Sequence, residues 1–314
     1  MLAYTLQRIA LALLICAVAI TALVSIIHVI PGDPVNIVLG PRATQEMRDT
    51  YRREMGMDKP VPLQILHFLG KAATGDLGKD MWSKRPVTVV VAETLPYTLT
   101  LIAAGLGWAV ILGIPLGCYS AVRRNSAIDK ITGVISVGTI SIPSFVVAIY
   151  GMLIFAVQLN WFPAIGAGER GDIVDQLHHL VMPAFALGLG WVGYLARLVR
   201  ASMLEIMGEH HVRTARAFGL RERSIIFRYA LRIAILPTIT LISLAFGNLL
   251  SSAVFTEIIF ARPGIGKLIV DAARVLNYPI VMGAVFITVT LFSIGTMLAD
   301  LVIARLDPRV RSSL

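Results

Sequence analysis

Charged residues are scarce in this chain of 314 residues. They make up 15% of it, whereas apolar residues make up 56%. Soluble domains carry about 25% charged and about 45–50% apolar residues. The chain therefore has too little polar surface to cover soluble domains of this length, which excludes a soluble enzyme. The high apolar content also excludes an intrinsically disordered chain.

Cysteine and histidine are also few, and their positions predict neither a disulfide nor a metal site. Cys16 and Cys118 both fall within apolar runs, where we expect small packing residues rather than a disulfide. Two adjacent histidine pairs, at 178–179 and 210–211, flank one predicted helix. About 30 residues at ~1.5 Å each would hold the pairs roughly 45 Å apart, so they cannot share an ion. We expect this chain to bind no metal and no cofactor.

The sequence also lacks a nucleotide-binding loop, which has the pattern Gly-x-x-x-x-Gly-Lys-Ser/Thr. The nearest fragment is Gly264–Lys267, but Ala261 occupies the position of the first glycine and Leu268 that of the Ser or Thr. Paired carboxylates and a nucleophile–base pattern are also missing. We therefore predict no catalytic residue in this chain.

Long charge-free runs are present instead, and they predict membrane helices. A membrane helix needs about 20 mostly apolar residues. Six gaps between charged residues reach this length, and the longest has 38 positions. We assign one helix to that gap because Pro143, Asn160, Trp161 and Pro163 interrupt it. The predicted fold is an all-α polytopic membrane protein with six transmembrane helices, near residues 9–30, 95–122, 131–157, 180–202, 233–257 and 278–304.

The distribution of Lys and Arg predicts how these helices are oriented. Cytoplasmic loops of membrane proteins carry an excess of Lys and Arg. With the N-terminus inside, fifteen of these residues fall on the inner side and four in the short outer loops. We therefore expect both termini in the cytoplasm. The formal net charge of +9 follows mostly from this asymmetry, and we expect no nucleic-acid partner.

The spans and loops divide the chain into four parts. Residues 1–32 hold a cytoplasmic N-terminus and the first helix, whose apolar run exceeds the ~7–15 residues of a signal peptide. Residues 33–93 form an extracytoplasmic segment, where Thr44 predicts the N-cap of a helix over 44–56. Residues 94–304 form a five-helix transmembrane core that contains a cytoplasmic loop, 203–232. Residues 305–314 form a cytoplasmic tail.

The cytoplasmic loop carries the most informative pattern. Two short helical segments are predicted there, separated at Gly208 and ended at Gly219. In the second segment, Val212, Ala215 and Phe218 recur every three residues and predict one apolar face. Such a helix could dock in the groove of a partner protein. It could equally lie on the membrane surface with its arginines at anionic lipid head groups, and the residues alone leave both interpretations open.

The apolar runs hold no charged residue near their centres. Ion-coupled carriers place ionisable groups in the middle of the membrane, whereas His28, Glu257 and Asp300 lie near the ends of the predicted helices. An ion-coupled carrier or channel that works without other subunits is therefore the weaker of two hypotheses. The favoured one is a conduit driven by energy from outside this chain.

A family resemblance favours the docking interpretation of the cytoplasmic loop. Arg213–Gly219, with Leu236–Pro237 downstream, is similar to the EAA loop of ABC-importer permeases, although Arg213 stands where the motif has Glu. Other motifs in order are Pro31–Pro34, Leu39–Pro41, Gly56–Pro60, Gly75–Gly78, Gly113–Gly117, Ser141–Phe145, Tyr194–Arg197, Arg200–Met203, Arg262–Gly266 and Asn277–Pro279. This succession covers nearly the whole chain and resembles the permease subunits of dipeptide/oligopeptide-type ABC importers, the inner membrane components of binding-protein-dependent transport systems.

The resemblance implies a type I ABC-importer permease fold in the bacterial cytoplasmic (inner) membrane. It also implies a heterodimer with a second homologous permease subunit, two cytoplasmic ATP-binding subunits that bind ATP and Mg, and an extracytoplasmic substrate-binding protein. The chain would itself contact membrane lipid and hydrolyse nothing. The expected ATPase-coupling residues are Gly208, Glu209, Val212, Arg213, Thr214, Ala215, Arg216, Ala217, Phe218 and Gly219.

Two roles are open for Glu257. It could line the pathway and bind the amino group of a peptide, or form a structural ion pair with Arg262 or Arg274 near the helix end. We favour the structural role.

The sequence motifs do not identify the substrate. Permeases of the resembled subfamily serve dipeptides, longer peptides, glutathione, nickel complexes, opines or sugars, and their selectivity resides largely in the binding protein. The expected function is half of the translocation pathway for peptides or similar small solutes.

Overall fold

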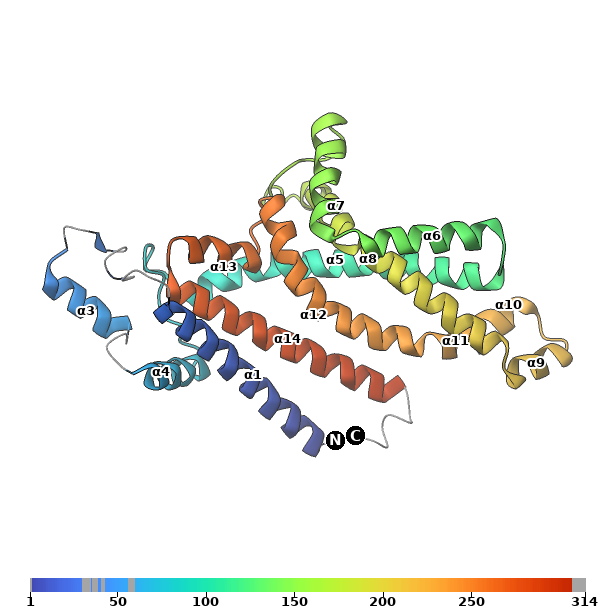
Figure 1. Ribbon diagram of the computed structural model, residues 1–314, viewed down its shortest axis with the longest axis horizontal. Helices are drawn as coiled ribbons and strands as arrows, with labels where there is room; N and C mark the ends of the chain where they lie inside the picture. Colours follow the sequence, from blue (N-terminus) through green and yellow to red (C-terminus); the bar gives the residue numbers. More distant parts are fainter. Residues whose placement is uncertain (1, 30–34, 36–38, 41–42, 56–59, 307–314) are drawn as a thin grey trace. The chain divides into compact units, whose positions relative to one another are not determined.

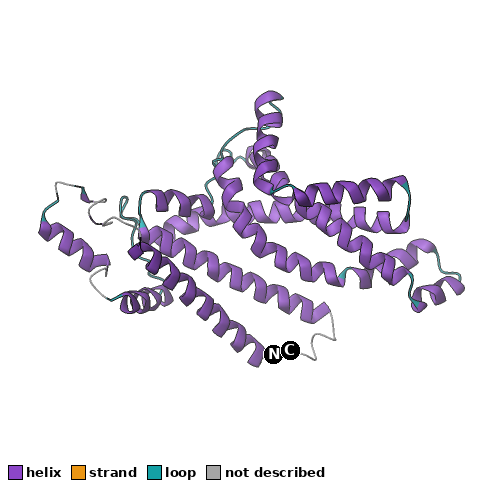
Figure 2. Cartoon of the chain, viewed as in Figure 1, coloured by secondary structure: helices purple, strands orange, loops and turns teal. Residues whose placement is uncertain are grey.

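The computed structural model describes residues 2–29, 35, 39–40, 43–55 and 60–306, and these residues are largely helical (Figure 2). Within these ranges, one isolated antiparallel bridge pairs Lys79 with Pro86. The predicted all-α class is therefore confirmed. Residues 307–314 of the predicted tail lie outside the described residues. The motif Pro31–Pro34 also lies outside them, although the next residue, Val35, is described.

Four helices are long and apolar enough to cross a membrane: α5 (Val87–Val122), α8 (Ile173–Met207), α12 (Leu236–Ile259) and α14 (Tyr278–Leu306). A fifth candidate is a bent pair, made of α6 (Ala127–Ser141) and of α7 (Ser144–Gly151) with the π-helix η1 (Met152–Gln158). In α1 (Leu2–Val29), the apolar stretch Ile9–Ser25 is shorter. All six predicted runs thus contain apolar helix, while the count of six spans stays a prediction.

The prediction of one continuous helix over 131–157 is wrong. The chain turns by 97° between α6 and α7. Ile142 is extended there, with φ −93° and ψ 120°. Proline disfavours helical geometry in the residue before it and has no N–H to continue the helical hydrogen bonds. Pro143 therefore ends α6 and starts the next helix in a new direction.

Contacts divide the chain into two compact units, Met1–Pro96 with Gly264–Ile294, and Tyr97–Pro263 with Gly295–Leu314. In the first unit, α4 (Val61–Ala73) packs on α1, and α3 is Gln45–Met55. The backbone N–H of Met47 donates to Thr44 Oγ1 at 3.3 Å, which confirms the predicted N-cap. The starts of α5 and α14 enclose an apolar core with α4 and α13 (Ile265–Arg274). Its buried members are Ala72, Leu77, Val87, Val91, Ile265, Ala272, Ile280, Val281 and Ala284.

A buried polar contact closes the first unit. Asn277, just before α14, donates from Nδ2 to Asp80 Oδ1 at 2.5 Å. The carboxylate also accepts from the backbone N–H groups of Trp82 and Ser83 at 3.1 and 3.2 Å. Burial raises the pKa of Asp80, but these hydrogen bonds outweigh burial and hold that pKa below its usual value. The loop before α5 is thereby fixed to the α13–α14 connection.

In the second unit, α8 is the central helix, since α6, α7 and α12 all pack against it (Figure 1). Ser126 caps α6 and Asp172 caps α8 by accepting backbone N–H groups. Glycines let the backbones of α5 and α8 approach closely. A Cβ atom added to Gly188 would overlap the carbonyl oxygen of Gly105 and the indole nitrogen of Trp108. Small residues permit this close packing of helices in lipid.

Candidate functional site

The predicted cytoplasmic loop 203–232 is mostly helical. α8 continues to Met207, five residues beyond the predicted end of the span, and a short helix α9 (His210–Ala217) follows. α10 (Glu222–Ser224), the π-helix η2 (Ile225–Ala230) and α11 (Leu231–Ala234) then lead to α12. The loop is therefore a folded extension of α8 and α12 (Figure 1).

Both predicted glycine breaks are confirmed. The N–H of Gly208 bonds to the carbonyl of Glu205 at 3.0 Å and closes the last turn of α8. Glu209 is extended and starts α9. At the other end, Gly219 has φ +72°, where a side chain would be strained. Its N–H bonds to Arg216 O at 2.9 Å and the next N–H bonds to Ala215 O at 3.3 Å, the pattern of a Schellman cap.

The buried face of α9 packs against its own chain. Val212 and Ala215 are 0% and 5% exposed, and they form a small core with Ile225 of η2. Ile206 and Met207, at the end of α8, pack against this core. α9 is thus fastened to η2 and to the end of α8 by buried apolar contacts.

The prediction that Phe218 shares this face is wrong, since its side chain is 81% exposed. At ~100° per residue, Phe218 lies about 120° around the helix axis from Val212. It also follows the last residue of α9, as the C-cap. A large aromatic side chain therefore projects from the end of α9, beside a glycine turn.

Polar groups complete the surface of α9. Arg216 forms an ion pair with Glu222, with Nη2 3.0 Å from Oε1. The hydroxyl of Thr214 donates to the carbonyl of His210 at 3.0 Å. Arg213 and Ala217 are exposed. The expected coupling residues therefore separate into an inward pair, Val212 and Ala215, and an outward set at the end of α9.

An ion pair joins Arg200 of α8, whose side chain is 32% exposed, to the buried Asp129 in the first turn of α6. Arg200 of α8 donates from Nε and Nη2 to the two carboxylate oxygens of Asp129, at 2.5 and 2.8 Å. Asp129, 4% exposed, also accepts from the Ser120 hydroxyl at 2.5 Å and from the Asn125 N–H at 2.9 Å. Our sequence analysis missed this site, although the Ser126-x-x-Asp129 spacing is typical of a helix start.

Glu257, near the end of α12, is wholly buried. It accepts a hydrogen bond from the Thr98 hydroxyl at 2.6 Å. Burial lowers the pKa of Arg262, which lies beyond the span, and the charge of Glu257 opposes that shift. Arg274, the other partner considered, belongs to the first unit. Glu257 thus lies among polar groups of its own unit, and the choice between its two roles stays a prediction.

The ion pair at Arg200 gives a test of stability. Arg200→Ala would leave the buried carboxylate of Asp129 without its cation, which costs about 3 kcal/mol where both partners are buried and less here, because Arg200 is 32% exposed. We expect a lower midpoint of unfolding in an SDS titration followed by tryptophan fluorescence. Arg197→Ala is the matched control, because Arg197 is exposed one turn earlier on the same helix. Equal effects of the two variants would contradict a stabilising role of the pair.

Comparisons with known proteins agree with this architecture. The family model described as "Binding-protein-dependent transport system inner membrane component" matches residues 113–312, and the N-terminal model of the same component matches residues 1–102. A putative peptide permease protein of Brucella suis is 37% identical over 99% of both chains. The glutathione transport system permease protein GsiC of Pectobacterium atrosepticum is 36% identical over 91% of both.

A solved structure shares the fold. The match is to the MetNI methionine ABC transporter in an inward-facing conformation, with a TM-score of 0.58 and 17% identity. It covers 69% of this chain and 96% of that one. The family matches, the relatives and the fold agree with one another: this chain belongs to the binding-protein-dependent transport system inner membrane components, and it is a permease subunit of an ABC importer.

Proposed function

We propose that the chain forms half of the translocation pathway for di- and oligopeptides, or for small peptide-like solutes such as glutathione. The relatives named for peptide and glutathione transport cover 99% and 91% of the chain and support this substrate class. The other half is a second homologous permease subunit. Two cytoplasmic ATP-binding subunits bind ATP and Mg, and an extracytoplasmic binding protein delivers the solute. The chain contributes no catalytic residue.

The proposed setting is the bacterial cytoplasmic membrane, with six spans and both termini inside. The family description as an inner membrane component supports this setting. The excess of Lys and Arg favours a cytoplasmic α9 and an external segment 33–93, which would offer a platform for the binding protein. The bent pair α6 and α7–η1 then counts as one span, and α1 as another.

The mechanism rests on one observation, which is that one face of α9 is packed against its own chain while its end is exposed. Its inward residues are fastened to α8, while Phe218 projects from its end with an exposed aromatic ring. Exposed aromatic side chains are typical anchors of protein interfaces. In the proposed cycle, Phe218 and its polar neighbours dock in a cleft of one ATPase subunit. ATP binding and hydrolysis move that subunit, and α9 passes the displacement to α8, so that the pathway opens alternately to each side.

Reconstitution tests the proposal against an ion-coupled carrier. The full complex in proteoliposomes should take up dialanine or glutathione when ATP and a binding protein are supplied. The chain alone should take up neither solute under a proton or sodium gradient, because it has no charged group placed in mid-membrane. Gradient-driven uptake by the chain alone would contradict the ABC mechanism.

The docking role of Phe218 predicts a loss of binding. Removing an interface anchor costs about 2 kcal/mol or more, so Phe218→Ala should bind the ATPase subunit at least about tenfold more weakly. Phe227→Ala is the matched control, because Phe227 is also exposed but lies on η2. The affinity is measured in detergent with a fluorescent ATPase subunit. Unchanged affinity of Phe218→Ala would remove Phe218 from the interface.

Cysteine labelling tests the orientation. Glu169 and Arg213 are exposed residues in the predicted outer and inner loops. In a background with Cys16→Ala and Cys118→Ala, a membrane-impermeant maleimide added to intact spheroplasts should label Glu169→Cys and leave Arg213→Cys unlabelled. Inside-out vesicles should show the reverse. The opposite pattern in both preparations would mean that the chain is inverted.

A further inference from the structure

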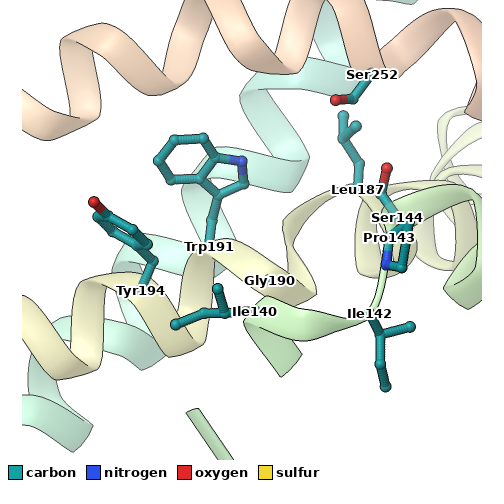
Figure 3. A pocket seen from close by; sticks show the side chains of 9 residues that line it. All are labelled: Ile140, Ile142, Pro143, Ser144, Leu187, Gly190, Trp191, Tyr194 and Ser252. Carbon is teal, nitrogen blue, oxygen red and sulfur yellow. The ribbon is translucent and has the colours of Figure 1, made fainter. Parts of the chain in front are cut away.

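A cavity of about 300 Å³ lies in the second unit, where α6 bends into α7 (Figure 3). Its walls come from both sides of the bend, from the middle of α8 and from α12. This volume is at the lower end of the range for small-molecule sites, about 300–1,000 Å³. The cavity is therefore large enough for part of a small solute, such as one side chain with its backbone.

The bend builds this cavity. Because Pro143 redirects the chain, α7 leaves the line of α6 and exposes the start of its own first turn at Ser144. On α8, which faces the bend, Gly190 has no side chain to fill the space. A Cβ atom there would lie 3.3 Å from the carbonyl oxygen of Thr139, so the glycine also lets α6 approach α8 closely. A bend and a glycine together leave a hollow between rigid helices.

The lining is uncharged but not wholly apolar. Leu187 and Ile140 supply apolar walls, and Trp191 supplies an aromatic one beside Tyr194, with ring centres 5.9 Å apart. Ser144 and Ser252 add hydroxyl groups. Figure 3 shows these side chains around the bend.

The polar groups of the lining are available for a ligand. Within the part of the chain that the structure describes, the hydroxyls of Ser144 and Ser252 and the indole N–H of Trp191 make no hydrogen bond. By contrast, Trp108 in the same unit donates its indole N–H to the carbonyl of Ala184 at 2.8 Å. Hydroxyls can donate and accept, so this set matches the alternating N–H and C=O groups of a peptide backbone.

We propose that this cavity is a transit site for short peptides, which binds main-chain amides and an apolar side chain. The proposal rests on the proposed function and adds the residues that contact the solute. An uncharged lining cannot form ion pairs with peptide termini or charged side chains, so binding there is weak and tolerant of sequence. Conduction requires such a site, because a solute that binds tightly does not leave.

The position of the cavity on α8 also couples it to the ATPase side. From Tyr194 to the end of α8 at Met207 is about 20 Å of continuous helix, at ~1.5 Å per residue. α9 is fastened at that end. A displacement of α9 therefore moves the wall that carries Trp191 and Tyr194 relative to the bend, which changes the cavity during each cycle.

Filling the cavity tests the proposal. Ser252→Phe places a ring in the hollow, whereas Ser251→Phe, its matched control, adds the same ring at the exposed neighbouring position on α12. The complete transporter with its binding protein and ATP is reconstituted, and uptake of dialanine and of glutathione is measured per assembled complex. We expect Ser252→Phe to reduce uptake at least tenfold, more for glutathione than for dialanine. We expect Ser251→Phe to stay within twofold of the wild type.

A thiol-protection measurement covers the case in which Ser252→Phe does not assemble. With Cys16→Ala and Cys118→Ala, the small variant Ser252→Cys is treated with a methanethiosulfonate reagent. We expect dialanine or glutathione, supplied under turnover, to slow the reaction at least threefold. A thiol that reacts equally with and without peptide, or never reacts because the second permease covers it, would overturn the transit site.

The outcomes separate the two proposals. If the wild-type complex takes up neither dialanine nor glutathione, the proposed substrate class fails. If the wild type takes up peptide and assembled Ser252→Phe does so equally well, the cavity proposal fails while the proposed function stands.

Discussion

The ion pair between Arg200 and the buried Asp129 holds α8 to the first turn of α6 in the second unit. Asp129 has hardly any contact with solvent, so its charge is stable because the guanidinium of Arg200 and two further donors, the Ser120 hydroxyl and the Asn125 N–H, satisfy both oxygens. The fork geometry of arginine fixes the direction of α8 as well as its distance from the α5–α6 turn. α8 is the helix on which the bend, the cavity and α9 are all placed, so this pair sets the frame for each of them.

The packing around α8 differs along its length. Near Arg200, α8 packs through Val199 and Met203 against buried residues of α5, η2 and α11. Beyond Met207, two residues, Gly208 and Glu209, separate α8 from α9, and the buried side chains of Val212, Ala215 and Ile225 pack the two helices together again. The bend at Pro143 lies beside the middle of α8, near Leu187 and Gly190. In the proposed cycle, a displacement that enters at α9 would pass through the closely packed segment near Arg200 before it reaches the part of α8 that faces the bend.

The sequence predicted those features that depend on neighbouring residues. Apolar runs, the Thr44 cap and the glycine breaks at 208 and 219 are local, and the structure places them as expected. The pairing of Arg200 with Asp129 joins residues 71 positions apart, and no local pattern specifies it. The length of a run without charged residues does not show where the chain changes direction, so the turn at Pro143 was missed. Phe218 was misplaced because a three-residue repeat drifts around a helix with 3.6 residues per turn.

If the proposed transit site is correct, its uncharged lining on α8 explains why this subunit can lack strong recognition groups. A charged site in the membrane would bind one end of a peptide and release it slowly, and its own burial would require a partner charge. In the proposed site, serine hydroxyls and an aromatic wall would avoid both costs, since they would bind the main-chain amides that all peptides share. Discrimination among solutes then falls to the binding protein of the proposed assembly, and directionality to its ATPase subunits. In the proposed pathway, the scarcity of charge in this chain would thus allow different peptides to pass along one route.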